Sequence, residues 1–312
     1  MIAAMLRDGR LHLQDGPIDL VCRAWGDAGE VRAGYEQAVA AFPVVLPGLC
    51  DDLAVLRSPL PLAGEGWVRV GASRRESGLV ARATLTPALS RQRERAGVSE
   101  RMVAACQPFA GGFITPMAAV AGAVADHVLA VMTRGRRLER AFVNNGGDIA
   151  FHLAPGHGLR CGLVTELAAP ALDGVFMLTS ANPARGIATS GRACKGRGGR
   201  SFSFGIADAV TVLGRTAAEA DAAATVVANE VDLPGHPAVR RRPASEIDPD
   251  SDLGERLITW DVGPLGAGEI AAALDRGRRV ADALRRDGLI LGAVLALRGQ
   301  IATLLPPCSE AA

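Results

Sequence analysis

The 312-residue sequence predicts an α+β fold, with a mainly antiparallel sheet and helices packed against it. Short runs rich in β-branched residues alternate with tight turns such as Asp15-Gly16-Pro17, which is typical of antiparallel hairpins. Longer segments, above all Ala267–Arg286, repeat apolar residues at helical spacing. We therefore expect one domain over residues 1–312, interrupted by an excursion at about 58–98.

Composition excludes several classes of function. The 34 Lys and Arg residues nearly balance the 33 Asp and Glu residues, so nothing indicates a nucleic-acid partner or an anionic membrane surface. The six cysteines are too scattered for a zinc site or a disulfide framework. Charged residues near the start leave no signal-peptide core, and the apolar runs are too short or too rich in Ala and Gly to span a membrane. We expect a cytoplasmic protein.

The N-terminal region predicts a hairpin followed by helices. Strands are expected at Met5–His12 and Ile18–Ala24, joined through the Asp15-Gly16-Pro17 turn. A helix is expected over Glu30–Ala41 and a second, shorter helix over Leu46–Leu56.

Residues 58 to 98 contain two segments whose sequences are related in an unusual way. Codons can be chosen for Ser58–Trp67 so that their reverse complement encodes Pro87–Ala96, residue for residue. This relation indicates a palindromic DNA element inserted in frame, and the alternative is a functional basic loop. We expect a long surface excursion that related proteins lack, because closing a longer loop costs little additional free energy.

The next region predicts a helix at Ser99–Cys106, a loop over Gln107–Pro116 and a helix over Met117–Met132. Pro116 suits a helix start because its φ is fixed. The second helix is rich in Ala and Gly, which would let another backbone or a ligand approach closely. The simpler explanation is tight packing against a sheet.

A glycine pair follows the next expected strand. Strands are expected at Arg140–Asn144 and Ile149–Leu153, with further strands at Leu159–Val164 and Val175–Leu178. The segment between the first two contains Gly146, Gly147 and Asp148. Paired glycines permit positive φ and leave N–H groups bare, so the segment could cradle an anion or a flat ring. The alternative is a hairpin turn with a β-bulge.

A second polar loop ends a strand at Gly186–Gly191. Here hydroxyls and amides could face a ligand, from Thr189, Ser190 and Gly191. Basic residues follow at Arg192, Lys195, Arg197 and Arg200. These cations would suit a phosphate or carboxylate, or they could form an ordinary solvated loop.

The last candidate site lies on an Ala-rich helix. Ala209–Leu213 predicts a buried strand, and Thr216 then caps the helix, with Glu219 completing a capping box. Asp221 and Thr225 are four residues apart and share one face of this helix. Hard oxygen ligands on a rigid face suit Mg²⁺. The alternative is that Asp221 is an acid favoured by the helix dipole and that Thr225 bonds the carbonyl one turn back.

The C-terminal region predicts an exposed connection over 237–257, a strand at Arg256–Val262 and the long helix Ala267–Arg286. The apolar stripe expected on this helix consists of Ala271, Leu274, Val280 and Leu284. A terminal hairpin is expected from Leu289–Leu297 and Gln300–Leu304.

Three motifs, in this order, resemble the ApbE-like superfamily, whose best-known members are FAD:protein FMN transferases. Asn144–Ile149 resembles that family's N-x-G-G-D-[IL] segment, and Ile187–Gly191 resembles its A-T-S-G loop. Val210–Val212 and Thr216–Thr225 resemble its S-V-T-V and T-A-x-x-A-D-A-x-A-T segments. Apart from the excursion, nearly the whole chain is more similar to the uncharacterised protein family numbered 0280, which shares Pro116–Gly122 and Ser203–Asp208.

The resemblance implies an ApbE-like fold that binds Mg²⁺ and FAD. Asp221 and Thr225 would ligate the metal, with the carbonyl of Ala121 as a third ligand. The dinucleotide would lie against the two polar loops, at Gly146, Gly147, Asp148, Thr189, Ser190 and Gly191. The metal would act as Lewis acid and template while a target Thr or Ser hydroxyl attacks the FMN phosphorus and AMP leaves.

Two departures set this chain apart from the transferases. The histidine of their His-x-[IL]-[DN]-P segment is absent from Arg200–Gly205, and Gly122 replaces the lysine of their G-x-A-K-G segment. Two hypotheses follow: an Mg²⁺-dependent transferase or hydrolase acting on FAD or a related dinucleotide, and a non-catalytic flavin- or nucleotide-binding protein. In a third, a structural or partner-binding protein, the motifs serve folding alone. A flavinylated acceptor protein and a homo-oligomeric state stay open.

Overall fold

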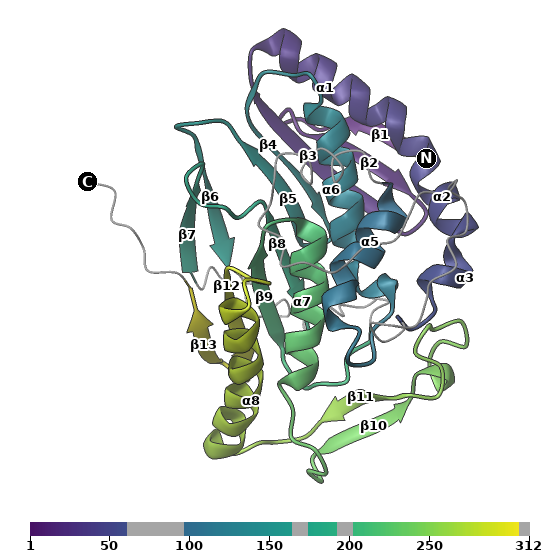
Figure 1. Ribbon diagram of the computed structural model, residues 1–312, viewed down its shortest axis with the longest axis vertical. Helices are drawn as coiled ribbons and strands as arrows, with labels where there is room; N and C mark the ends of the chain where they lie inside the picture. Colours follow the sequence, from purple (N-terminus) through teal and green to yellow (C-terminus); the bar gives the residue numbers. More distant parts are fainter. Residues whose placement is uncertain (61–96, 164–173, 192–201, 306–312) are drawn as a thin grey trace, which may run out of the picture.

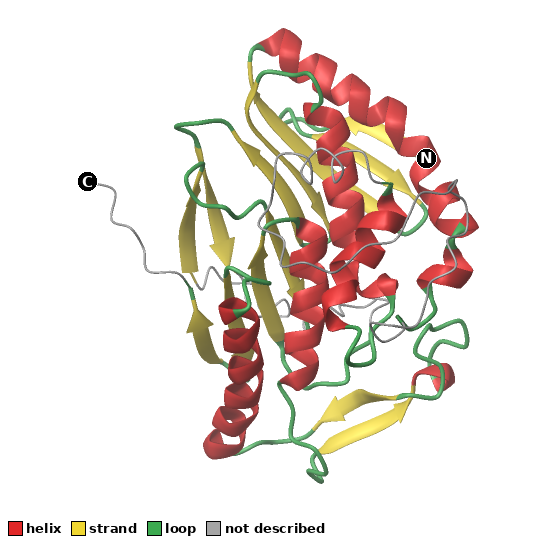
Figure 2. Ribbon diagram, viewed as in Figure 1, coloured by secondary structure: helices red, strands yellow, loops and turns green. Residues whose placement is uncertain are grey.

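The computed structural model describes residues 1–60, 97–163, 174–191 and 202–305. A nine-stranded antiparallel sheet runs through the molecule in the order β1-β2-β3-β4-β5-β8-β9-β12-β13. The helices pack on one face of this sheet (Figures 1 and 2). The fold is therefore α+β, with a mainly antiparallel sheet and packed helices, as the sequence predicts.

The strands of the large sheet are short and mostly follow the predicted hairpins. They are β1 Ile2–Met5, β2 Leu11–Asp15, β3 Ile18–Gly26, β4 Leu138–Asn145, β5 Asp148–Leu153, β8 Gly186–Ser190, β9 Ala209–Gly214, β12 Gly292–Leu297 and β13 Gln300–Leu304. Two antiparallel ribbons stand apart from it: β6 Gly158–Leu163 with β7 Gly174–Thr179, and β10 Val239–Pro243 with β11 Leu257–Val262.

The helices also match their predicted positions, apart from the region Leu46–Leu56. They are α1 Ala28–Ala41, α2 Val45–Asp51, α3 Leu53–Leu56, α5 Val98–Cys106, α6 Val120–Thr133, α7 Ala217–Glu230 and α8 Ala267–Arg286. Short 3₁₀ turns lie at Phe42–Val44, Gln107–Phe109, Pro116–Ala119 and Ala244–Glu246. The predicted cap of α7 is confirmed, because the Thr216 hydroxyl accepts the N–H of Glu219 at 3.1 Å.

Two predictions near the N-terminus were wrong in detail. The expected strand Met5–His12 is divided by a turn in which the N–H of Leu6 donates to the carbonyl of Arg10 at 2.8 Å. Gly9 supplies the positive φ of 80° that this turn requires. The expected helix Leu46–Leu56 is two helices, because Asp52 between them has non-helical backbone angles.

Two further predictions were wrong near the C-terminus. The connection 237–257 is not entirely a loop, because it contains strand β10, whose backbone pairs with β11. The arginines of β10 are the reason why the sequence predicted a solvated loop. On α8, Ala271 is exposed and Ile270 is buried in its place. The stripe was therefore misplaced by one residue at its start.

The predicted excursion at 58–98 falls mostly on residues 61–96, which lie outside the described residues. Its two described flanks belong to the packed fold. Leu60 is buried and its N–H donates to the carbonyl of Ile114 at 3.0 Å. Val98 is buried at the start of α5. The insertion hypothesis itself stays a prediction.

The pleat of the central strands sends side chains into two separate cores. On the helix side, Ala141, Val143 and Ala150 pack with residues of α6 and α7. On the other side, Phe151 and Ile187 pack with side chains of the β6–β7 ribbon. Adjacent residues of one strand therefore serve opposite faces.

Helices α6 and α7 meet at a glycine. A Cβ at Gly122 would lie 2.3 Å from the carbonyl oxygen of Ala217, so the two backbones are in direct contact. The buried carboxylate of Asp126, on α6, accepts the N–H groups of Ala217 at 3.0 Å and Ala218 at 2.9 Å. It caps the first turn of α7. At Gly122 the small residue thus lets another backbone, that of α7, approach closely, while Ala123 and Ala125 lie in the core shared with the sheet, as the simpler explanation expects.

One stretch of the described residues, Pro116–Thr133, is long and apolar enough to cross a membrane by length and composition. Half of it is buried inside the fold. A buried core helix gives the same signal, so this stretch is weak evidence for a membrane span.

We expect Gly122→Ala to lower the free energy of unfolding by roughly 1–3 kcal/mol, because the added methyl group would force α6 and α7 apart. Gly268→Ala is the matched control: Gly268 lies on α8 with nothing within 4 Å of an added Cβ. That change should be neutral or slightly stabilising. Urea denaturation of both variants measures the difference, and equal effects would contradict the close contact.

Candidate functional site

The glycine pair forms the tight turn between β4 and β5. The two strands pair in register up to Asn145 opposite Asp148, so Gly146 and Gly147 are the turn residues. Their φ angles are 63° and 110°. The side-chain oxygen of Asn144 accepts the N–H of Gly147 at 2.8 Å. The hairpin alternative is therefore correct, without a bulge in this strand pair. A Cβ at either glycine would meet nothing within 4 Å, which leaves the turn open to a ligand.

The predicted site residues divide between the two faces of the sheet. Asp148 and Ser190 point to the helix side, whereas Thr189 points to the opposite side, because successive side chains alternate along a strand. The predicted dinucleotide residues therefore do not form one surface. The Gly146–Gly147 turn is the place where both faces can be reached.

On the helix side, Asp221 of α7 reaches the first turn of α6. Its Oδ2 accepts the N–H of Gly122 at 3.0 Å. The adjacent carbonyl, that of Ala121, accepts the side-chain N–H of Asn145 at 3.1 Å. The structure thus brings two of the three predicted metal ligands together, beside the end of β4.

The third predicted ligand, Thr225, lies one turn further along α7 on the face of Asp221. One alternative from the sequence was a hydrogen bond from the Thr225 hydroxyl to the backbone carbonyl one turn back. Within the described part of the chain this bond is not formed, and the hydroxyl has no protein partner there. Asp221 does act at a helix N-terminus, but at that of α6 and not that of its own helix.

A second carboxylate, Asp148, lies close to Asp221. Asp148 is 8% exposed, and its Oδ1 accepts the N–H of Thr189 at 3.1 Å. Burial and the negative charge of Asp221 raise the pKa of Asp148 well above its ordinary value. Burial raises the pKa of Asp221 to about 7, although the amides of Gly122 and Ala121 oppose the shift. The site therefore disfavours two full negative charges, and a divalent cation would relieve the repulsion.

The A-T-S-G loop is shaped by close backbone contact. Gly191 has a φ of 124°, and a Cβ there would lie 2.9 Å from the carbonyl oxygen of Asp208. The Thr189 and Thr211 hydroxyls are 2.8 Å apart and hydrogen-bonded across β8 and β9. The predicted cationic loop, Arg192 to Arg200, lies outside the described residues.

A cavity of about 580 Å³ opens on the face opposite the helices. Its polar part is formed by Arg140, Asn144, the Gly146–Gly147 turn, Arg160, Thr189 and Thr211. Apolar and aromatic side chains form most of its walls: Trp25, Phe142, Ile149, Phe151, Leu159, Phe176 and Ile187. The cavity has the size and character of a site for a small planar molecule.

Sequence reasoning missed the cavity walls. Trp25 and Arg140 come from β3 and β4, which pair directly, and the Arg140 guanidinium lies 4.6 Å from the centroid of the Trp25 ring. Arg140 also donates to the carbonyl of Gly158 at 3.3 Å, which ties the wall to the β6–β7 ribbon. Alternation along each strand would place these side chains on one face, but nothing in the local sequence says that the ribbon covers that face.

The fold and the site together define an α+β protein with a carboxylate pair and an open glycine turn at the end of a central hairpin. The chain belongs to the family described as AbpE bacteria, whose model matches residues 3–303.

The curated relatives are UPF0280 proteins of archaea. The chain is 34% identical to that of Methanoregula boonei over 151 residues, which are 47% of this chain and 60% of the relative. It is 38% identical to that of Methanothermobacter thermautotrophicus over 122 residues, which cover 39% and 44% of the two chains. The match therefore spans about half of each relative, and their names describe no activity.

Among solved structures, the ApbE protein of Thermotoga maritima is similar over 61% of this chain and 50% of its own, with a TM-score of 0.34 and 16% sequence identity.

We expect the metal-free protein to lose stability as the pH rises from about 4 to about 7. The folded-state pKa values of Asp126 and Asp221, about 6 and about 7, lie above their ordinary value of 3.8. In this window the folded protein binds more protons than the unfolded chain, so raising the pH removes a stabilising contribution.

Urea unfolding in the presence of a chelator, between pH 4 and 8, measures this slope. Asp221→Asn should reduce the dependence of the free energy of unfolding on pH near pH 7. Asp275→Asn, which removes an exposed carboxylate of α8 paired with Arg278, should leave it unchanged. Identical slopes for wild type and Asp221→Asn would refute the assignment.

Proposed function

We propose that this chain binds FAD or a related dinucleotide through Mg²⁺ at the β4–β5 turn. The observation that supports the proposal best is the approach of two carboxylates, Asp148 and Asp221, beside an open glycine turn and an aromatic-walled cavity. The carboxylates suit a divalent cation, and the cavity suits a planar ring.

The donor atoms suit Mg²⁺ better than a transition metal. No group of three or more His, Cys, Asp or Glu side chains that could together hold a metal ion occurs within the described ranges. The Asp221 carboxylate, the Thr225 hydroxyl and the Ala121 carbonyl are all oxygen donors, and Mg²⁺ commonly completes its shell with water and phosphate. The Ala121 carbonyl stands in the first turn of α6, where it accepts the side-chain N–H of Asn145 at 3.1 Å. An ion held there would polarise a phosphoryl oxygen.

The dinucleotide would pass across the turn, with parts on both faces of the sheet. No side chain shields the backbone of Gly146 and Gly147, so a diphosphate can approach the turn closely. A ring would enter the cavity beside Trp25, where the Thr189 hydroxyl and the Asn144 amide offer polar contacts. This division explains why the predicted site residues lie on two faces.

One observation favours a second candidate, a flavin- or nucleotide-binding protein without transferase activity. The transferases that this chain resembles carry a lysine where Gly122 stands. Here a Cβ at that position would lie 2.3 Å from the carbonyl oxygen of Ala217, so no side chain fits between the helices. A reaction that needs this lysine is not open to the chain in this packing.

We expect FAD to bind the purified chain with Mg²⁺ and at least tenfold more weakly in EDTA. Asp221→Asn should remove the Mg²⁺ effect, because the amide still accepts the N–H of Gly122 but carries no charge for the metal. Thr225→Val should reduce the effect of Mg²⁺ on FAD affinity by a smaller amount. Isothermal titration calorimetry gives the affinities, and chromatography of the same mixtures detects AMP.

The outcomes separate the hypotheses. AMP release with tight binding supports the enzyme and directs attention to an acceptor, whereas binding without release supports the carrier. Asp275→Asn, far along the exposed face of α8, is the matched control and should bind as the wild type does. If FAD binds equally well with or without Mg²⁺ and to Asp221→Asn, its site lies elsewhere on the molecule. If FAD does not bind at all, the proposal is wrong.

A further inference from the structure

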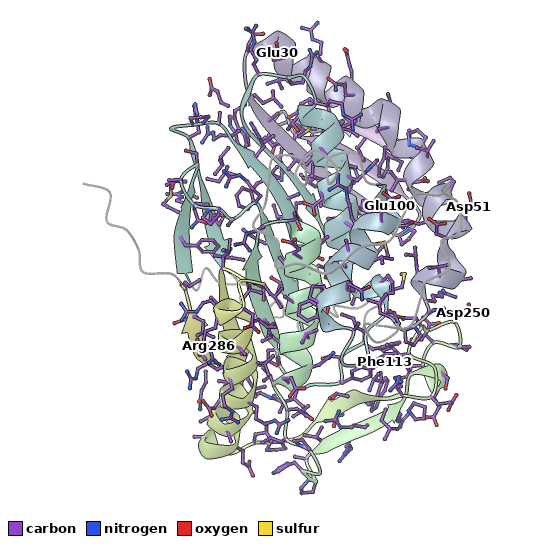
Figure 3. The ribbon with its side chains drawn as sticks, viewed as in Figure 1. Glu30, Asp51, Glu100, Phe113, Asp250 and Arg286 are labelled. Carbon is purple, nitrogen blue, oxygen red and sulfur yellow. The ribbon has the colours of Figure 1, made fainter. Side chains whose placement is uncertain are left out.

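A second cavity, of about 650 Å³, shares no lining residue with the cavity at the β4–β5 turn. It is open to solvent and is lined by the loop that follows α5, by the C-terminal half of α7 and by the start of β11. Figure 3 labels Phe113 in this region, close to the β10–β11 ribbon. None of its lining residues belongs to the candidate site described above. What it binds is therefore a separate question.

The cavity has an aromatic wall with a cation stacked on it. Phe113 and Phe204 meet edge to face, with ring centroids 6.1 Å apart and an interplanar angle of 63°. The guanidinium of Arg256 lies 3.5 Å from the centroid of the Phe113 ring. Stacking of this kind keeps the edge of the guanidinium, with its N–H groups, available to a ligand.

The walls are fixed by hydrogen bonds that do not involve a ligand. The N–H of Phe204 donates to Oδ1 of Asn229 at 2.9 Å, and its carbonyl accepts the Thr259 hydroxyl at 3.1 Å. The opposite loop is held because the Thr115 hydroxyl donates to the carboxylate of Asp252. The cavity is thus built into the fold and needs no rearrangement to be present.

The polar groups that face the cavity are mainly hydrogen-bond donors. Within the described residues, the Arg256 guanidinium has neither a carboxylate partner nor a hydrogen bond. Asn229 uses Oδ1 for the fold, which leaves its NH₂ group as the free end. The acid of the lining, Glu230, is paired with Arg276 at 3.3 Å. The local charge therefore favours an anion.

We propose that this cavity binds a small aromatic anion, a planar ring that carries a carboxylate or a phosphate. The ring packs against Phe113 and Phe204, and the anionic group pairs with the guanidinium of Arg256 and the amide of Asn229. The proposal requires neither the metal nor the dinucleotide of the candidate site.

Three probes with one ring and different charge test the proposal: phenyl phosphate, benzyl alcohol and benzylamine. In EDTA, which removes any metal-held phosphate, titration calorimetry or ligand-observed NMR should show phenyl phosphate binding at least fivefold more tightly than either other probe. Arg256→Gln should abolish this preference. Asn229→Asp keeps the acceptor for the N–H of Phe204 but adds a negative charge, so it should lower the affinity for phenyl phosphate at least fivefold.

The matched control is Arg242→Gln. Arg242 is also exposed and stacks on an aromatic ring, that of Trp260 at 5.0 Å, but it does not line the cavity. It should leave all three affinities unchanged, with thermal melting confirming that each variant is folded. Equal affinities of the three probes, no binding of phenyl phosphate, or equal effects of Arg256→Gln and Arg242→Gln would each overturn the proposal.

Discussion

The reciprocal capping of α6 and α7 is the constraint on which the candidate site depends. Asp126 of α6 accepts the first N–H groups of α7, and Asp221 of α7 accepts an N–H from the first turn of α6. Each acid satisfies donors at a helix end that the other helix shields from water. Both reach their partners because Gly122 lets the backbones touch.

This packing also gives Asp221 its electrostatic character. An exposed acid at a helix N-terminus would have a lowered pKa, because amides and the helix dipole favour the charged form. For Asp221 burial outweighs the amides, and its pKa rises to about 7. Asp148, buried at the end of the central hairpin, lies so near Asp221 that its own pKa also rises, and the pair resists carrying two negative charges. The repulsion comes from the way two helices and one hairpin meet, and a cation is the simplest way to relieve it.

Local sequence signals predicted most of the fold, including both ends of α8, the cap of α7 and the turn at Gly146 and Gly147. These features depend on periodicity and backbone preference, which neighbouring residues specify. The sequence motifs did not predict which face of the sheet each site residue occupies. Thr189 and Ser190, for example, are adjacent on β8 and therefore point to opposite faces. The wall formed by Trp25 and the β6–β7 ribbon depends on pairing between distant segments, which one sequence does not reveal.

Gly122 links the packing of this chain to its chemistry. The close contact that it permits is the reason why Asp221 can cap α6 and lie beside the Ala121 carbonyl. The same contact leaves no space for the lysine that the transferases carry at this position. A lysine here would push α6 away from α7 and would break the caps that both helices need. Capping acids and a lysine at position 122 therefore exclude one another in this packing. Any reaction at this site would have to proceed without that lysine.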